Sequence, residues 1–377
     1  MKSKWKEKKD LFIRKVKNII RYSDEQKKGK KIICAHFSEN SIKKINGEIM
    51  SEDEKAIWLK SFLDYNVFRP DVAYKSAQSF CNDSIEIVKN TYMQNIPKDE
   101  PILVCNVRDD IDRIKMSIKY HREMGVKYFA IMDNCSQDGT YEWLLEQDID
   151  VFTVREQYTS VKRVGWITKV ADYYGFDRWF IILDSDELLT YRGIENNPIQ
   201  SFIRELCQNK INRAPMFMLD MYANENDLED RGENIDIESK YNLFDTDSYI
   251  MSDDFKGILV YGGPRERYFG KEAPRELLTK YPIVFLRMGE IYCYHFVFPF
   301  EQNFDSEIKG VLRHYKFING DIDKYKRIVK EGNYAGGSAL YKKYLEKMKD
   351  TKEIDFVYEG TAKYQSSEDL KNISIMP

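Results

Sequence analysis

Apolar and polar residues follow a regular pattern in the middle of the chain, and this pattern predicts strands and helices in turn. Short apolar runs at 102–107, 128–132, 151–154 and 179–183 are typical of strands buried on both faces of a sheet. Between them lie stretches with helical spacing, the first of which ends at Gly125, a residue suited to the turn after a helix. Such alternation predicts an α/β fold, with a mostly parallel sheet flanked by helices.

The two ends of the chain have a different composition. Residues 1–99 are Lys-rich and predict a mainly helical extension, with one strand-like stretch at 32–36. A polar break containing Pro101 separates them from a catalytic domain expected over 100–304. Residues 305–377 are charged and Tyr-rich, and they predict a helical segment that completes the site.

Charge narrows the possible partners. The net charge of −3 argues against a general nucleic-acid binder. Residues 1–31 nevertheless hold thirteen Lys or Arg against four Asp or Glu, with apolar residues near helical spacing. One interpretation is a helix resting on the inner face of the cell membrane, and the other is a leader helix packed on its own domain. Without a signal peptide or an apolar run long enough to span a bilayer, the expected location is the cytoplasm.

Polar clusters follow three of the predicted strands, at 108–110, 133–140 and 184–187. In parallel sheets, ligands bind beyond the carboxyl ends of the strands, so these clusters are expected on one rim. Asp184 and Asp186 lie past a strand end, where a turn can aim both carboxylates at one cation. Such hard oxygen ligands suit Mg²⁺ or Mn²⁺, which also bind the oxygens of a diphosphate. The alternative is a surface turn with solvated carboxylates.

The same segments resemble a family of enzymes. Val107 to Asp110, Tyr120 to Val126, Asp133 to Thr140 and Trp179 to Glu187 are similar to the pattern V-R-N-E, Y-H-R-x-x-G-V, D-N-x-S-x-D-G-T and L-D-x-D-E. This pattern belongs to the family-2-like glycosyltransferases with the GT-A fold, in a bacterial branch. The resemblance covers about residues 101–370, although Asp109 and Asp110 replace the usual Asn-Glu.

The resemblance implies a metal-dependent glycosyltransferase with a nucleotide-sugar donor, UDP being the implied nucleotide. The implied acceptor is a glycan, a lipid-linked glycan or a protein. Asp186 would be the main metal ligand, and Asp184 would lie near both the ribose and the metal. The implied nucleotide-binding residues in the first two loops are Arg108, Asp109, Asp110, Asp133, Asn134 and Asp138.

Family members commonly bring a downstream histidine to the metal or the diphosphate. Of the four histidines, His121 lies on an apolar helix stripe and is expected to be structural, and His36 lies outside the core. His295 and His314 remain as candidates. His314 is preferred because Arg313 and Lys316 flank it, which suits a diphosphate.

An inverting transferase also needs a base that accepts the proton of the acceptor hydroxyl. The apolar run at 214–219 predicts a strand beside the Asp-x-Asp edge, and this strand ends at Asp220, the first candidate. Glu225 is the second. Arg265 and Arg267 could bind a phosphate or an anionic acceptor, although their segment is also a plain charged turn.

Two other functions fit the same fold. A nucleotidyltransferase that makes nucleotide-sugars would be expected to carry a Gly-rich basic loop after the first strand, where this chain has Arg108-Asp109-Asp110. A non-catalytic binding or scaffold protein would not need the Asp184 and Asp186 pair.

Overall fold

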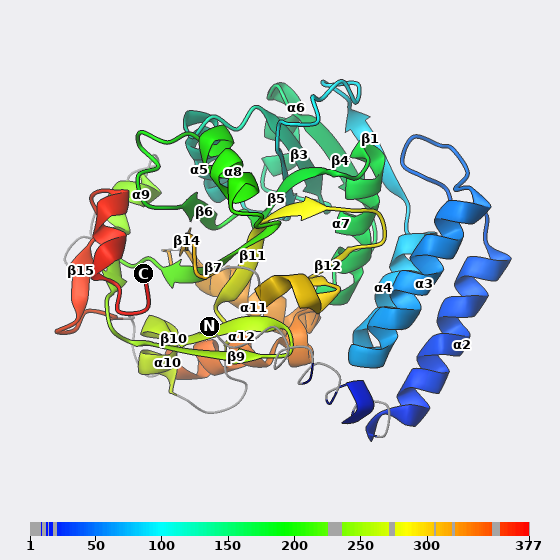
Figure 1. Cartoon of the computed structure of the whole chain (residues 1–377). Helices are drawn as coiled ribbons and strands as arrows, with labels where there is room; N and C mark the ends of the chain where they lie inside the picture. Colours follow the sequence, from blue (N-terminus) through cyan, green and yellow to red (C-terminus); the bar gives the residue numbers. More distant parts are fainter. Residues whose placement is uncertain are drawn as a thin grey trace.

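A computed structural model describes residues 21–224, 236–270, 276–304, 307–318, 321–348 and 355–376, together with residues 9, 13 and 15–17. Its centre is a nine-stranded sheet with helices on both sides (Figure 1). In spatial order the strands are β1 (Ile85–Lys89), β4 (Asp150–Val154), β3 (Tyr128–Asp133), β2 (Ile102–Val107), β5 (Arg178–Asp184), β11 (Thr279–Leu286), β7 (Arg213–Asp220), β14 (Gly310–His314) and β6 (Glu187–Thr190).

The α/β class is confirmed, but the sheet is mixed. Strands β4, β3, β2 and β5 run parallel to one another, and β14 runs parallel to β7. The other four pairings are antiparallel. Strand β11 lies between β5 and β7, so the strand ending at Asp220 is one position further from the Asp-x-Asp edge than expected.

The alternation predicted for 102–183 is present. The connecting helices are α5 (Ile111–Glu123), α6 (Thr140–Glu146) and α7 (Ser160–Tyr174). Helix α5 ends as expected, because Gly125 has a φ of 93° and the next amide, of Val126, donates to the His121 carbonyl at 2.9 Å. Helix α7 begins where the Thr159 hydroxyl accepts from the Lys162 amide at 3.1 Å.

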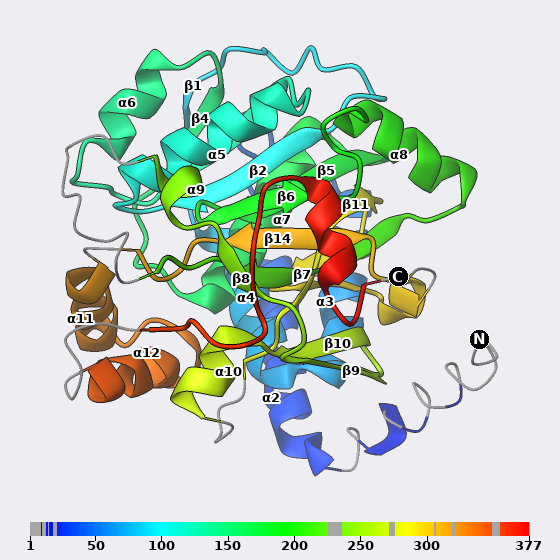
Figure 2. The same cartoon turned by 90° about the vertical axis from the view of Figure 1, so that its left-hand side faces the viewer.

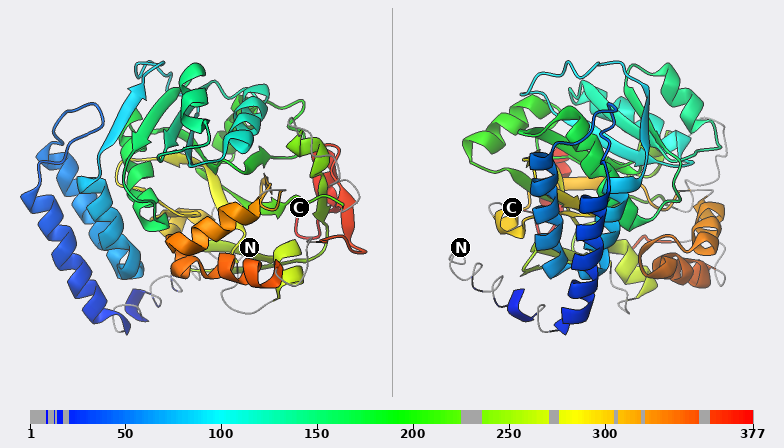
Figure 3. Two further views of the ribbon diagram at one scale, coloured as in Figure 1. Left: turned by 180° about the vertical axis from the view of Figure 1, so that it is seen from behind. Right: turned by 90° about the vertical axis from the view of Figure 1, so that its right-hand side faces the viewer.

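The N-terminal helices form a layer beside α7, seen from behind in Figure 3. They are α2 (Ser23–Glu39), α3 (Glu52–Phe68) and α4 (Pro70–Asn82). The strand predicted at 32–36 is wrong: this stretch is part of α2, whose Ile33 and Phe37 are one turn apart and both buried. Strand β1 precedes the expected boundary at residue 100 and still pairs with β4.

The C-terminal part is not wholly helical, because β14 pairs with both β7 and β6 inside the main sheet. After it come α11 (Asp321–Glu331) and α12 (Ala335–Met348), which lie side by side in Figure 2. The remaining elements are α8 (Ile199–Gln208), α9 (Ile237–Lys240), β8 (Leu243–Asp245), β9 (Tyr249–Asp254), β10 (Gly257–Gly262), α10 (Gly263–Phe269), β12 (Ile291–Cys293), β13 (Phe296–Phe298), η2 (Phe300–Phe304), β15 (Thr361–Lys363) and η3 (Ser367–Asn372). None of the helices in the described ranges is long and apolar enough to cross a membrane.

Candidate functional site

A cleft of about 790 Å³ opens at the carboxyl ends of β2 and β5. Its walls come from α4, the start of α7, the turn between β12 and β13, and helices α11 and α12. The three polar loops expected on one rim do meet there. The Ser185 hydroxyl donates to Asp110 at 2.5 Å, and the Asp109 amide donates to the Ser136 hydroxyl at 2.9 Å.

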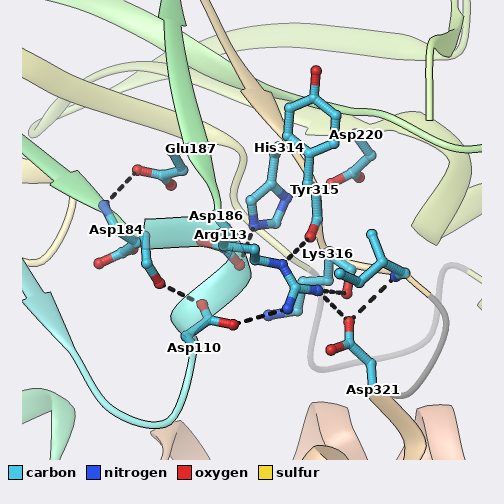
Figure 4. Close-up of polar contacts among 12 residues, drawn as sticks. Asp110, Arg113, Asp184, Asp186, Glu187, Asp220, His314, Tyr315, Lys316 and Asp321 are labelled. Carbon is cyan, nitrogen blue, oxygen red and sulfur yellow. Dashed lines mark hydrogen bonds and ion pairs between the residues drawn. The ribbon is translucent and has the colours of Figure 1, made fainter. Parts of the chain in front are cut away.

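Three side chains from three strand ends form a line beside this cleft (Figure 4). His314 ends β14, and its Nδ1 lies 2.6 Å from Asp220 at the end of β7. The other ring nitrogen, Nε2, lies 3.4 Å from a carboxylate oxygen of Asp186. Asp186 and His314 line the cleft, whereas Asp220 lies behind the imidazole.

The charges of Asp186, His314 and Asp220 shift one another's pKa values towards the charged forms. Burial alone would lower the pKa of His314, but the carboxylates of Asp186 and Asp220 outweigh it and raise that pKa above the usual value for an imidazole. Burial would likewise raise the pKa of Asp186, yet His314 and Lys316 hold it well below its ordinary value. These directions favour a negative Asp186 and a proton on the facing ring nitrogen of His314, at a position where a cation could replace that proton.

Asp186, Glu187 and His314 each offer a ligand atom, and these atoms lie within 4.8 Å of one another. Glu187 is fully buried, where Lys280 and the Asp184 amide bind its carboxylate at 2.5 and 3.0 Å. Asp184 lines the cleft, but Arg163 and Lys280 bind its two oxygens at 2.7 and 2.5 Å. Asp186 and His314 are therefore the better placed pair for a metal.

Cations surround the same part of the cleft. Arg113 binds Asp110 at 2.9 Å and also pairs with Asp321. Lys324 of α11 binds Asp110 at 3.0 Å, and Arg108 forms two 3.2 Å hydrogen bonds with Glu331 at the end of α11. These contacts fix α11 over the loop that follows β2.

Several predicted residues lie elsewhere. Arg267 binds Asp245 at 3.0 Å, and its guanidinium lies over the Tyr358 ring, so it is not part of the cleft. Asp138 holds its own turn by accepting from the Thr140 and Ile111 amides. Glu225 lies outside the described residues.

Asp133 and Asn134 are buried below the rim instead of lining the cleft. The Asn134 amide group donates to the Val154 carbonyl at 2.7 Å, and Asp133 accepts from the Ser136 amide at 3.1 Å. One oxygen of each has no hydrogen-bond partner in the part of the chain that the structure describes. Asp109 accepts from the Gln137 amide and binds Arg327 at 2.5 Å, so it connects the loop after β3 with helix α11 and does not line the cleft.

Asp220 is an unsuitable base as it stands. It is 2% exposed, and its two oxygens lie 2.6 Å from Arg265 Nε and 2.6 Å from His314 Nδ1. Burial would raise its pKa, but Arg265 and His314 outweigh this and lower it, which weakens it as a proton acceptor. Arg265 lines the cleft and also pairs with Glu276, and its predicted binding of a phosphate or an anionic acceptor stays a prediction.

The structure also shows the positions of His295 and His121, the other two histidines with predicted roles. His295 lines the cleft at the β12–β13 turn but is not in the group that could hold a metal. His121 is fully buried, and its Nε2 accepts from the Leu189 amide at 3.2 Å, so its expected structural role is confirmed.

Two residues that bind Asp184 in the cleft, Arg163 and Lys280, were not predicted from the sequence. The sequence does contain a signal for Lys280, because this lysine stands within the apolar run of strand β11; the structure shows it buried, at 1% exposure. Arg163 belongs to α7, where a charged residue on a helix gives no sign of burial.

Comparisons with known proteins give no family assignment. No family model matches the chain, and no curated protein matches it.

Proposed function

We propose that this protein is a glycosyltransferase that moves a sugar from a nucleotide-diphosphate donor, with UDP as the nucleotide, to a glycan, lipid-linked or protein acceptor. The observation that carries the proposal is the meeting of Asp186 and His314. They come from strand ends 128 positions apart in the chain, lie 3.4 Å apart, and line a cleft at the carboxyl ends of the strands.

The donor set fits a divalent metal. Carboxylate and imidazole together favour Mn²⁺ over Mg²⁺, which prefers oxygen ligands alone. Asp186 and His314 would hold the ion and leave positions open for water and diphosphate oxygens. The bound ion would supply a Lewis acid that neutralises charge on the leaving diphosphate.

The residues around this pair have roles that follow from their contacts. Asp220 orients His314 through Nδ1, an arrangement that typically strengthens a metal-bound histidine. Lys316, Lys324 and Arg265 line the cleft and suit the negative charge of a diphosphate. Asp110 fixes the Asp184-Ser185-Asp186 turn through the Ser185 hydroxyl.

A thermal-shift screen tests the proposal. UDP, GDP and CMP are each added with and without Mn²⁺ to the full chain, to Asp186→Ala and to a control variant, Asp64→Ala on α3. We expect stabilisation by UDP that requires Mn²⁺, present in the wild type and the control and lost in Asp186→Ala. If no nucleotide gives a metal-dependent shift in the wild type, the proposal is wrong.

A further inference from the structure

The turn between β12 and β13 lines the cleft with two side chains that meet different charged groups. Because Cys293 pairs with Phe296, the turn consists of two residues, Tyr294 and His295. His295 interacts electrostatically with Lys280, Asp184 and Arg163. Burial raises the pKa of Tyr294 to about 12, and the neighbouring Arg69 opposes that shift.

The part of the cleft around Tyr294 has a wall from the N-terminal helices. Arg69, at the junction of α3 and α4, and Lys75 of α4 line it, together with Lys256 from the turn after β9. Asp71 is the carboxylate among the N-terminal residues that line the cleft. We call Arg69, Lys75, Lys256 and Tyr294 the α4 subsite. Asp71 pairs with Arg69 at 3.2 Å and Asp254 pairs with Lys256 at 3.7 Å, so its three cations have two acids beside them and the charge of Lys75 is in excess.

Arg69 has the geometry of an oxyanion receptor. Its Nε and one terminal nitrogen hydrogen-bond the two oxygens of Asp71 at 3.3 and 3.2 Å, so the planar fork already holds a carboxylate. The Arg69 and Asp71 side chains are 37% and 67% exposed, which leaves the pair open to exchange with a ligand. An exposed pair of this kind contributes little to stability, so replacing Asp71 by a bound anion costs the protein little.

The same region also offers apolar surface. Lys256 Nζ lies 5.0 Å from the centre of the Phe296 ring, and Phe300 and Tyr65 line the cleft nearby. A ligand here would place an anionic group on the cations and a ring or alkyl group on the aromatic side chains.

We infer that the α4 subsite binds the acceptor and selects one that carries an oxyanion, either a phosphate or a carboxylate. The term acceptor rests on the proposed glycosyltransferase function, whereas the binding of an oxyanion does not. The N-terminal helices thereby gain a role in specificity, since they supply Arg69 and Lys75 to the same cleft that Asp186 and His314 line.

Calorimetric titrations of the full chain test this inference, with UDP and Mn²⁺ saturating so that added anions are excluded from the metal side. The probes are glucose, methyl glucuronide, glucose 6-phosphate and dodecyl phosphate, which separate neutral, carboxylate, sugar-phosphate and lipid-phosphate chemistry. We expect at least one anionic probe to bind about 10-fold or more tightly than glucose. Anionic probes that bind no better than glucose would overturn the inference.

Variants with opposite expected effects exclude misfolding as the cause. Arg69→Gln, alone or with Lys75→Gln, should weaken the anionic probe by about 10-fold or more, because it removes a charge-assisted contact. Asp71→Asn should tighten it, because it removes the internal competitor for Arg69. Arg204→Gln, on the exposed surface of α8, is the control and should change nothing. Unchanged binding by Arg69→Gln would contradict the inference.

The two proposals can fail separately. The Mn²⁺-dependent shift with UDP is measured on the same variants, and Arg69→Gln should retain it. If UDP does not bind, the titrations are repeated without nucleotide, and Arg69-dependent anion binding would then support an anion site and not a transferase. If UDP binds and Arg69→Gln has no effect on the anionic probes, the transferase proposal stands and the α4 subsite is refuted.

Discussion

At the scale of single residues, the imidazole of His314 is held by a carboxylate at each of its two ring nitrogens. It lies between Asp186 and Asp220, and Arg265 binds the outer oxygen of Asp220 at 2.6 Å. This order of alternating charges fixes the ring so that Nε2 points at Asp186 and the cleft. A metal at this position would displace the proton that Nε2 of His314 otherwise carries beside Asp186.

Removing the charge of Asp220 tests this role. Asp220→Asn should weaken Mn²⁺ binding by about 10- to 100-fold, as is typical when the partner of a metal-bound histidine is lost. A base at Asp220 would behave differently, because its loss would abolish turnover and leave Mn²⁺ affinity unchanged. Free Mn²⁺, measured by its electron paramagnetic resonance signal, distinguishes the two.

His121 should control part of the pH dependence of stability. Burial lowers the pKa of His121 from 6.5 to about 4. Between these pH values the unfolded chain binds a proton at His121 and the folded protein does not. Stability is therefore lost as the pH falls from about 6.5 towards 4, and His121 alone should cost about 2 kcal/mol between pH 7 and pH 5.

The corresponding measurement is urea unfolding of the wild type and His121→Gln at both pH values. The glutamine variant starts less stable, because the bond to the Leu189 amide is disturbed, but it should lose about 2 kcal/mol less than the wild type on acidification. An equal loss in both proteins would show that His121 is not the group responsible.

The predictability of the site residues follows from where each stands in the chain. Asp186 was predictable, because a polar residue directly after an apolar strand lies at the carboxyl edge of the sheet. His314 was selected through the family resemblance and its basic neighbours Arg313 and Lys316, and the strand that it ends was not expected. The misplacement of Arg267 arose because Asp245, its partner, is 22 positions away, and no local pattern reports such an ion pair. Asp220 was placed correctly at a strand end, but the sequence could not reveal that Arg265 and His314 occupy its oxygens.

At the scale of elements, the strands and helices between 102 and 184 were predictable because their periods are clear and their loops short. The spatial order of the strands that follow β5 in the sheet could not be predicted from the sequence. Strands β11, β14 and β6 pair across long connections, and neither their neighbours nor their directions follow from periodicity. For the same reason β14 was expected to belong to a helical segment.

The close approach of α4 and α7 gives a prediction at this scale. A Cβ atom at Gly165 would lie 2.6 Å from the Ser76 carbonyl oxygen and 2.7 Å from the Phe80 nitrogen, both of which are backbone atoms. Gly165→Ala should therefore lower the free energy of unfolding by about 1–3 kcal/mol, as overpacking does. In a helix without such a neighbour, the same change would stabilise by about 1 kcal/mol. Thermal unfolding decides the sign, and a stabilised variant would rule out this packing.

At the scale of the whole molecule, the N-terminal helices and the sheet share one hydrophobic core. Trp58 and Phe80 pack in the same cluster as Val104 of β2 and Phe180 of β5. The boundary expected after residue 99 therefore does not separate two cores. We expect the N-terminal helices and the nine-stranded sheet to unfold in one transition, with tryptophan fluorescence and far-UV circular dichroism changing together. Separate midpoints would indicate an N-terminal unit that folds alone.

The central claim is that Asp186 and His314 form a metal site that nucleotide binding depends on. Its most direct test is a Mn²⁺ titration followed by electron paramagnetic resonance, with and without UDP, on the wild type, Asp186→Ala, His314→Ala and the Asp64→Ala control. We predict one Mn²⁺ site that UDP tightens, unchanged in the control and weakened by more than about 100-fold in both site variants, since losing a ligand costs more than losing a residue that orients one. Equal Mn²⁺ affinity in Asp186→Ala and the wild type would contradict the account.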